Sequence, residues 1–254
     1  MPTARAETHP HQNQLLSGLP PAERERLVPK LEPVTLSLGQ VICESNQRGS
    51  CGYFLANSVV SLLYTMESGA TAGMALVGND GIVGTAIFLG GESTSSRAVV
   101  VIAGQAFRLS AMLLLEEFER NAALHQVLLR YTHALITQLS QTAVCNCLHS
   151  VEQRLCRQLL MCHDRTGCSE LLMTQELIAQ MLGARRESVT VAAGHLQDMG
   201  LIHYCRGHIA ILDRRALEAS ACECYRIVEE KRAIVLREAK VRVQPAPCFL
   251  RASG

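Results

Sequence analysis

The sequence predicts an α+β fold with an antiparallel β-roll near the N-terminus, a long helix in the middle and a compact helical unit near the C-terminus. Three patterns predict it. Short apolar runs separated by glycine-containing turns fill residues 34–107, a heptad-like repeat fills residues 121–149, and two short amphipathic helices joined by a glycine follow near residue 183. The period of the apolar residues separates strand from helix in each case.

Composition sets limits on the class of protein. The chain has 254 residues, enough for two domains, and 48% of them are hydrophobic. Only 4% are aromatic and none is Trp, so the cores must be aliphatic. The formal net charge of +1 argues against a uniformly basic nucleic-acid binder. Any contact with DNA must therefore come from a local basic patch.

The N-terminal segment is polar. We expect residues 1–13 to be disordered and residues 14–31 to be helical, with Pro20-Pro21 in a first helical turn. The first residues contain no apolar core of a signal peptide, and no apolar run has the length of a membrane span. Eleven cysteines without an export signal favour reduced thiols. We therefore expect a cytoplasmic protein that does not associate with membranes.

Residues 34–107 alternate between short apolar runs and turns. The turns include Gly-Asn-Asp-Gly at residues 78–81 and Gly-Gly at residues 90–91. Short apolar runs separated by such regularly spaced turns are typical of an antiparallel roll or sandwich. We place this domain, with its flanking helices, at residues 14–120.

A long helix is predicted over residues 121–149, with Asn121 as its cap and a length of roughly 40 Å. Apolar and amide side chains recur along it at four-three spacing, at Leu124, Leu128, Tyr131, Leu135 and Gln138. This stripe is either a core face or a dimer seam. Ser150-Val-Glu-Gln153 is a capping box that starts a new helix, so we place a hinge near His149. The next domain then covers residues 150–240, and residues 241–254 form an irregular tail.

The stretch from Leu171 to Leu212 carries the strongest functional signal. Thr174 is an N-cap before a short amphipathic helix, and Gly183 ends that helix. A second helix presents Arg186 and Thr190 on its surface, and a hairpin with Arg206-Gly207 in its turn follows. This order predicts a winged helix-turn-helix, with a further helix from Asp213 to about Arg237.

The same stretch resembles the DNA-binding domain of the CRP/FNR superfamily of bacterial transcription regulators. The pattern T-x4-A-x3-G-x2-R-E-x-V is present as Thr174, Ala179, Gly183, Arg186, Glu187 and Val189. The residues before it are also similar to the cyclic-nucleotide-binding-like β-roll of that family. The resemblance implies a homodimer joined by the long helix, so we favour the stripe from Leu124 to Gln138 as the dimer seam. It also implies binding to a palindromic operator on double-stranded DNA, with RNA polymerase as a further partner.

By this resemblance, the second helix would enter the major groove. Arg186 and Glu187 would read base edges. Arg185, Ser188 and Thr190 would contact phosphates or adjacent bases. Thr174, Gln175 and Arg206 complete the predicted set of DNA-binding residues. A third base-reading arginine, common in the family one turn further on, is replaced here by Val191.

The cyclic-nucleotide cassette of the family is degenerate in this chain. The family pattern has Gly-Glu and then Arg-Ser/Thr-Ala, and the best match is Gly84-Thr85 followed by Arg97-Ala98. The missing Glu and Ser/Thr remove hydrogen bonds to the ligand, so we expect no control by cyclic AMP. Gly84, Thr85 and Arg97 remain the candidate ligand-binding residues.

Cysteine spacing gives no defined metal motif. Cys145, His149, Cys156 and His163 would share one helix face if the helix were continuous, but the capping box at Ser150 argues against continuity. No C-x-x-C pair occurs, and no Cys precedes Cys43 as an iron–sulfur member would require. We therefore expect no metal and no cofactor.

Two alternative functions remain open. One is a signalling module that senses a ligand, metal or redox state through the roll or the clustered Cys without binding DNA. The other is a Cys-dependent enzyme, although no Cys lies in a recognisable nucleophile motif and we assign no catalytic residue.

Overall fold

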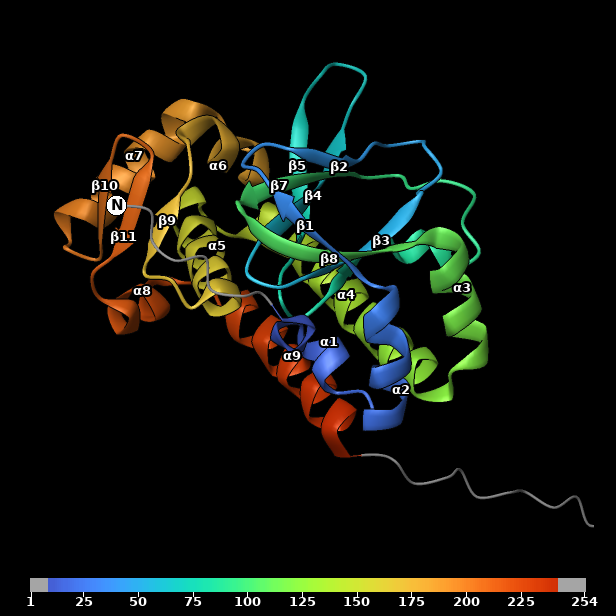
Figure 1. Cartoon of the computed structure of the whole chain (residues 1–254). Coiled ribbons are helices and arrows are strands. Elements are labelled where there is room, and N and C mark those ends of the chain that lie inside the picture. Colours follow the sequence, from blue (N-terminus) through green and yellow to red (C-terminus); the bar gives the residue numbers. More distant parts are fainter. Residues whose placement is uncertain (1–8, 242–254) are drawn as a thin grey trace, which may run out of the picture.

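The computed structural model describes residues 9–241. Figure 1 shows two packed units, a β-roll surrounded by α1–α4 and a smaller helical unit with its own sheet. The helices are η1 (Pro10–Gln12), α1 (Gln14–Ser17), α2 (Pro21–Leu27), η2 (Val28–Lys30), η3 (Thr85–Ile87), α3 (Ala111–Arg120), α4 (Ala122–Leu148), α5 (Val151–Thr166), α6 (Gln175–Leu182), α7 (Arg186–Asp198), α8 (Arg214–Ser220) and α9 (Cys224–Val241). The strands are β1 (Glu32–Leu36), β2 (Val41–Cys43), β3 (Cys51–Leu55), β4 (Val59–Thr65), β5 (Thr71–Val77), β6 (Ile82–Val83), β7 (Arg97–Ile102), β8 (Gly104–Ser110), β9 (Glu170–Leu172), β10 (Ile202–Cys205) and β11 (His208–Ile211). The predicted α+β fold with an antiparallel roll is confirmed.

The roll consists of two four-stranded sheets. Their strand orders are β1-β8-β3-β6 and β2-β7-β4-β5, and all pairs are antiparallel. β7 lies between β2 and β4 in its sheet, and its residues Ala98–Val101 are buried. The core of the roll is mainly aliphatic, with a few aromatic side chains such as Phe54 and Phe107 and no Trp.

The N-terminal segment differs from both expectations. Residues 14–31 do not form one helix, because Gly18 ends α1 and Pro20, in an extended conformation, precedes α2. A proline cannot donate the backbone hydrogen bond that a continuous helix needs at this point. Residues 9–13 are also ordered, since buried Asn13 donates to the carbonyl oxygens of Leu55 and Gly81 at 2.9 and 2.8 Å. Residues 1–8 and 242–254 lie outside the described residues.

The stripe predicted as a dimer seam packs inside the protomer. All five residues are buried in the single chain: Leu124, Leu128, Tyr131, Leu135 and Gln138. The Tyr131 hydroxyl donates to the Ile82 carbonyl at 3.0 Å, and Gln138 Nε2 donates to the Leu76 carbonyl at 3.2 Å. The prediction was wrong because a helical repeat marks a buried face without telling whether the same chain or a partner covers it.

α4 ends at Leu148, and α5 begins with the predicted capping box. Ser150 Oγ accepts from the Gln153 amide at 3.2 Å, and Gln153 Oε1 accepts from the Ser150 amide at 3.1 Å. The segment after Asp213 is two helices rather than the one predicted, since the chain leaves the helical conformation at Ala221. The second of these helices, α9, lies along α4 (Figure 1).

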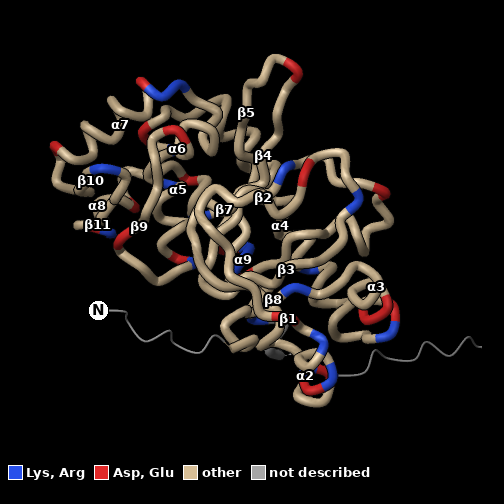
Figure 2. Tube along the Cα trace, turned by 45° about the horizontal axis from the view of Figure 1, so that its top comes forward, with Lys and Arg blue, Asp and Glu red and all other residues tan. Residues whose placement is uncertain are grey.

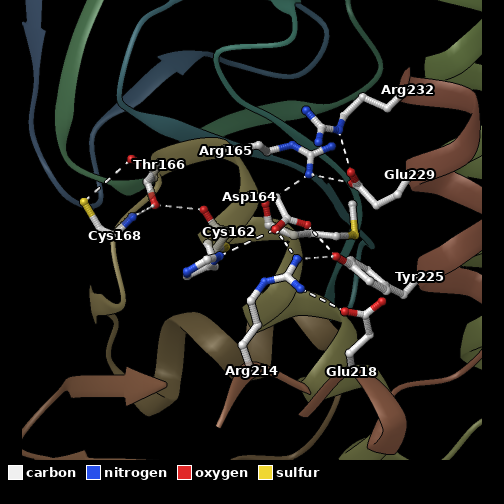
Figure 3. A network of polar contacts seen from close by, with 12 residues as sticks. Cys162, Asp164, Arg165, Thr166, Cys168, Arg214, Glu218, Tyr225, Glu229 and Arg232 are labelled. Carbon is white, nitrogen blue, oxygen red and sulfur yellow. Dashed lines mark hydrogen bonds and ion pairs between the residues drawn. The ribbon is translucent and has the colours of Figure 1, made fainter. Parts of the chain in front are cut away.

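An ionic network joins the two units, and Figure 3 shows its residues on α5, α8 and α9. Arg165 of α5 is 2% exposed and pairs with Asp80, in the turn before β6, at 3.0 Å, and with Glu229 of α9 at 3.5 Å. Arg232 pairs with Glu229 at 2.6 Å. Beside this group, Arg214 pairs with Asp164 at 2.7 Å. Asp80 thus holds α5 and α9 against the roll, and the Arg214–Asp164 pair holds α8 on α5.

Candidate nucleic-acid interface

α6 is positioned by its first residue and by its apolar face. Thr174 Oγ1 accepts from the Leu177 amide at 3.2 Å, which satisfies one of the free N–H groups at the start of the helix. Leu177, Ile178, Met181 and Leu182 are buried in the core of the small unit. The other side of α6 therefore faces solvent and leaves Thr174 exposed.

The turn between α6 and α7 is shaped by Gly183. Its φ of 58° is left-handed, a conformation that glycine adopts without strain. The same end of α6 packs closely on β5, since a Cβ added to Gly73 would lie 2.4 Å from the Met181 carbonyl oxygen. The small unit is thus docked against the β4–β5 hairpin of the roll.

α7 presents the predicted reading residues to solvent. Val189, Ala192, Ala193 and Leu196 face the core, so the remaining face is free. That face holds five exposed residues predicted to contact DNA: Arg185, Arg186, Glu187, Ser188 and Thr190. No side chain caps the N-terminus of α7, which leaves its first N–H groups available to an anion such as a phosphate. Val191 is 73% exposed on the same helix.

Gln175 links the two helices on their outer side. Its Oε1 accepts from Thr190 Oγ1 at 3.2 Å and lies 3.5 Å from Arg186 Nε. Thr190 Oγ1 also lies 3.0 Å from the Arg186 carbonyl oxygen, and its single proton can serve one of these acceptors at a time. The contact to Arg186 is long, so the guanidinium keeps its remaining donors for a ligand.

The hairpin of β10 and β11 forms the wing. Arg206 and Gly207 occupy its turn with φ of 50° and 84°, as a two-residue primed turn requires. A left-handed arginine is strained by about 1–2 kcal/mol relative to glycine, which is compensated by the rest of the fold. The turn holds the exposed Arg206 side chain at the tip of the wing.

These elements surround an open hollow of about 380 Å³. Its lining includes Thr174, Gln175, Arg186 and Arg206. Figure 2 shows basic residues near α7 and the wing next to acidic ones, so the positive surface is local, as the net charge of +1 requires. The hollow, the free end of α7 and the wing together form a surface suited to a phosphate backbone.

The candidate ligand-binding residues of the roll are not brought together. Gly84, with φ of 108°, and Thr85 line a cavity of about 40 Å³ inside the roll. Arg97 does not line this cavity and pairs instead with Glu44 at 3.2 Å, where both side chains are half-exposed. Ligand pockets usually measure roughly 300–1,000 Å³, so this cavity has no room for a nucleotide.

One side-chain contact of α7 could not be predicted from the sequence. His195 Nδ1 lies 2.6 Å from Glu152 Oε2 of α5. The hydrogen bond to this carboxylate and its negative charge raise the pKa of His195 above the ordinary value of 6.5. The two residues are 43 positions apart, and only the packing of α5 on α7 brings them together.

No helix among the described residues combines the length and the apolar character that a membrane span needs.

Comparisons with known proteins agree with this geometry. The family model of the Crp-like helix-turn-helix domain matches residues 153–220. A search of curated proteins finds no relative. A solved structure of a putative CRP/FNR-family transcriptional regulator from Eubacterium rectale aligns with a TM-score of 0.63 at 18% identity, covering 81% of this chain and 96% of that one.

Two further solved structures show the same likeness. FixK2 from Bradyrhizobium japonicum aligns with a TM-score of 0.65 at 15% identity, covering 76% of this chain and 98% of that chain. A CRP/FNR-family transcriptional regulator from Thermus thermophilus aligns with a TM-score of 0.58 at 22% identity, covering 75% and 98%. Residues 153–220 therefore match the Crp-like helix-turn-helix domain model, and the chain has the fold of the CRP/FNR transcription regulators.

Proposed function

We propose that this protein is a sequence-specific DNA-binding transcription regulator that acts as a homodimer in the cytoplasm and is not controlled by cyclic AMP. The observation that carries the proposal is the exposed face of α7, where Arg186 and Glu187 stand beside an uncapped helix N-terminus and a basic wing. Lys and Arg contacts to phosphates would make the affinity depend on salt. No catalytic group is required for this role.

Arg186 is expected to read a guanine and Glu187 a cytosine amino group. The experiment selects bound sites from random DNA and then measures the affinity of wild type and Arg186→Ala for every single-base variant of the selected operator. Arg186→Ala should lose about 1–3 kcal/mol at one base pair and accept other bases there. An equal loss on all sequences would mean that Arg186 touches only phosphate, and the absence of any selected site would overturn the proposal.

The dimer would use the outer face of α4 instead of the buried stripe. Side chains exposed in the single chain recur there every three or four residues: Leu129, His133, Ile136, Ser140 and Val144. Leu129 is 40% exposed and Ile136 is 54% exposed, and a row of exposed apolar side chains on one helix face marks a site of protein–protein contact. α4 has 27 residues and is about 40 Å long, which suits a two-fold axis that places two α7 helices roughly 34 Å apart.

Ile136→Asp tests this interface, because a carboxylate in the centre of an apolar seam lacks a partner. Sedimentation should show a monomer and a large loss of operator affinity. Met112→Asp on α3, another exposed apolar position, is the matched control and should remain dimeric. If the Ile136→Asp protein remained dimeric, the outer face of α4 would not be the dimer interface.

Independence from cyclic AMP is supported by the small size of the cavity at Gly84 and Thr85 and by Arg97, which is paired outside that cavity. Calorimetric titration should show no binding of cyclic AMP, and the operator affinity should be unchanged by it.

A further inference from the structure

Three cysteines and a histidine meet where α4, the α4–α5 hinge and the α8–α9 joint come together. Cys145 lies in the last turn of α4, and His149 follows the end of that helix. Cys222 precedes α9, and Cys224 is its first residue. The ligating atoms of the four residues all lie within 4.8 Å of one another. We propose that Cys145, His149, Cys222 and Cys224 form a mononuclear zinc site that fastens α9 to the end of α4.

The distances fit one tetrahedral ion. Zn–S bonds of about 2.3 Å and Zn–N bonds of about 2.0–2.1 Å place neighbouring ligand atoms roughly 3.5–3.8 Å apart in a tetrahedron. Cys145 Sγ lies 3.5 Å from Cys222 Sγ, and Cys224 Sγ lies 3.5 Å from His149 Nδ1. In an iron–sulfur cubane each sulfur binds a different iron, so the sulfurs would be spread more widely. Three sulfurs and one imidazole nitrogen are also a typical donor set for zinc.

The surroundings of the four residues orient them as ligands. His149 Nε2 lies 3.2 Å from Glu223 Oε2, so the carboxylate fixes the tautomer that leaves Nδ1 free to bind the ion. Gln141 Nε2 donates to Cys224 Sγ at 3.1 Å, as expected beside a thiolate. Metal-bound histidines generally have such a partner on their second ring nitrogen.

The charge of the site is balanced by a buried arginine. Three thiolates and one divalent ion leave a single negative charge, and Cys145, Cys222 and Cys224 are all buried. Arg157 of α5 is 5% exposed, interacts with Cys145 and donates to Thr142 Oγ1 at 2.6 Å. No ion pair within the described residues involves a carboxylate and Arg157. A buried guanidinium of this kind is costly without a negative partner, which a zinc–thiolate centre supplies.

The site differs from the set of residues that the sequence suggested. Cys156 and His163 do not join Cys145 and His149, because the hinge turns α5 away from the line of α4. Burial raises the pKa of Cys156 to about 12, as for an inert core thiol. Cys145 and His149 keep the C-x3-H spacing seen in the sequence, and the C-x-C spacing at residues 222–224 supplies the other two ligands.

The experiment uses the full-length protein, purified under reducing conditions without chelator. Elemental analysis measures zinc per chain for wild type, Cys224→Ser and Cys147→Ser. Cys147 is exposed and lies two residues from Cys145, so its substitution is the matched control. Protein stripped with a chelator is then titrated with Co²⁺, whose absorption reports tetrahedral thiolate ligation.

We expect about one zinc per chain in wild type and in Cys147→Ser, and its loss in Cys224→Ser. Glu223→Gln should keep the stoichiometry and weaken metal affinity by about 10–100-fold. The Co²⁺ titration of wild type gives a decision even if Cys224→Ser does not fold. Equal metal content in both cysteine variants, a cobalt spectrum without thiolate charge transfer, or a Cys145–Cys222 disulfide in the peptide map would each overturn the proposal.

Discussion

Asp80→Asn should destabilise the protein more than any exposed charge substitution. Asp80 is 7% exposed, and its Oδ2 lies 3.0 Å from Arg165 Nη2 and 3.8 Å from Arg232 Nε. Its Oδ1 accepts from the Gly78 amide at 3.1 Å, a bond that the asparagine oxygen can keep. The substitution therefore removes the negative charge, and Glu229 must then balance both arginines.

The structure allows the cost to be estimated. Removing one partner of a buried ion pair costs about 3–5 kcal/mol, because the other charge stays buried without compensation. Glu229 remains 3.5 Å from Arg165 Nη1 and keeps part of the balance, so we expect the low end, about 3 kcal/mol. For a chain of this size that corresponds to a fall in Tm of roughly 6–12 °C.

Urea unfolding followed by circular dichroism gives the free energy of unfolding of each variant. Glu32→Gln is the control, since Glu32 and Arg108 pair at 2.7 Å on the surface and should contribute less than about 1 kcal/mol. The double variant Asp80→Asn/Arg165→Met removes both charges and should recover stability relative to Asp80→Asn. A loss for Asp80→Asn no larger than for Glu32→Gln, or no recovery in the double variant, would refute the reasoning.

Two further predictions concern the DNA-binding unit. Arg206→Asn should relieve the left-handed strain at φ 50° and raise the free energy of unfolding by about 1 kcal/mol, while lowering the salt slope of operator binding by about one. Urea midpoints and operator binding at several salt concentrations check it. An unchanged salt slope would mean that the wing does not contact DNA. The raised pKa of His195 makes its contact with Glu152 stabilising below the ordinary value of 6.5, and this contribution is lost as pH rises through the folded-state pKa. Glu152→Gln should therefore lower the urea midpoint at acidic pH and leave it unchanged at alkaline pH, whereas a pH-independent difference would contradict the assignment.

The parts of the site that follow from local chemistry could be predicted. Thr174 caps α6 and Gly183 takes a left-handed φ, because both roles depend on a few neighbouring backbone groups. The exposed face of α7 follows from helical periodicity alone. The position of Arg97 could not be predicted, because its partner Glu44 is set by how β2 pairs with β7.

The cysteines show the same division. The sequence shows the spacing of the cysteines. However, His149 ends α4 and Cys222 precedes α9, so no periodic pattern in the sequence relates these two residues. Only the packing of α9 along α4 brings the sulfur atoms together.

By itself, the sequence determined the α+β order of the chain, the antiparallel roll and the helix-turn-helix with its wing, because caps, turns and apolar periods act over a few residues. Tertiary structure alone decided which face of α4 is covered, how Asp80 meets Arg165 and which thiols lie together. These features depend on contacts between segments far apart in the chain, and a periodic stripe does not specify what packs on it.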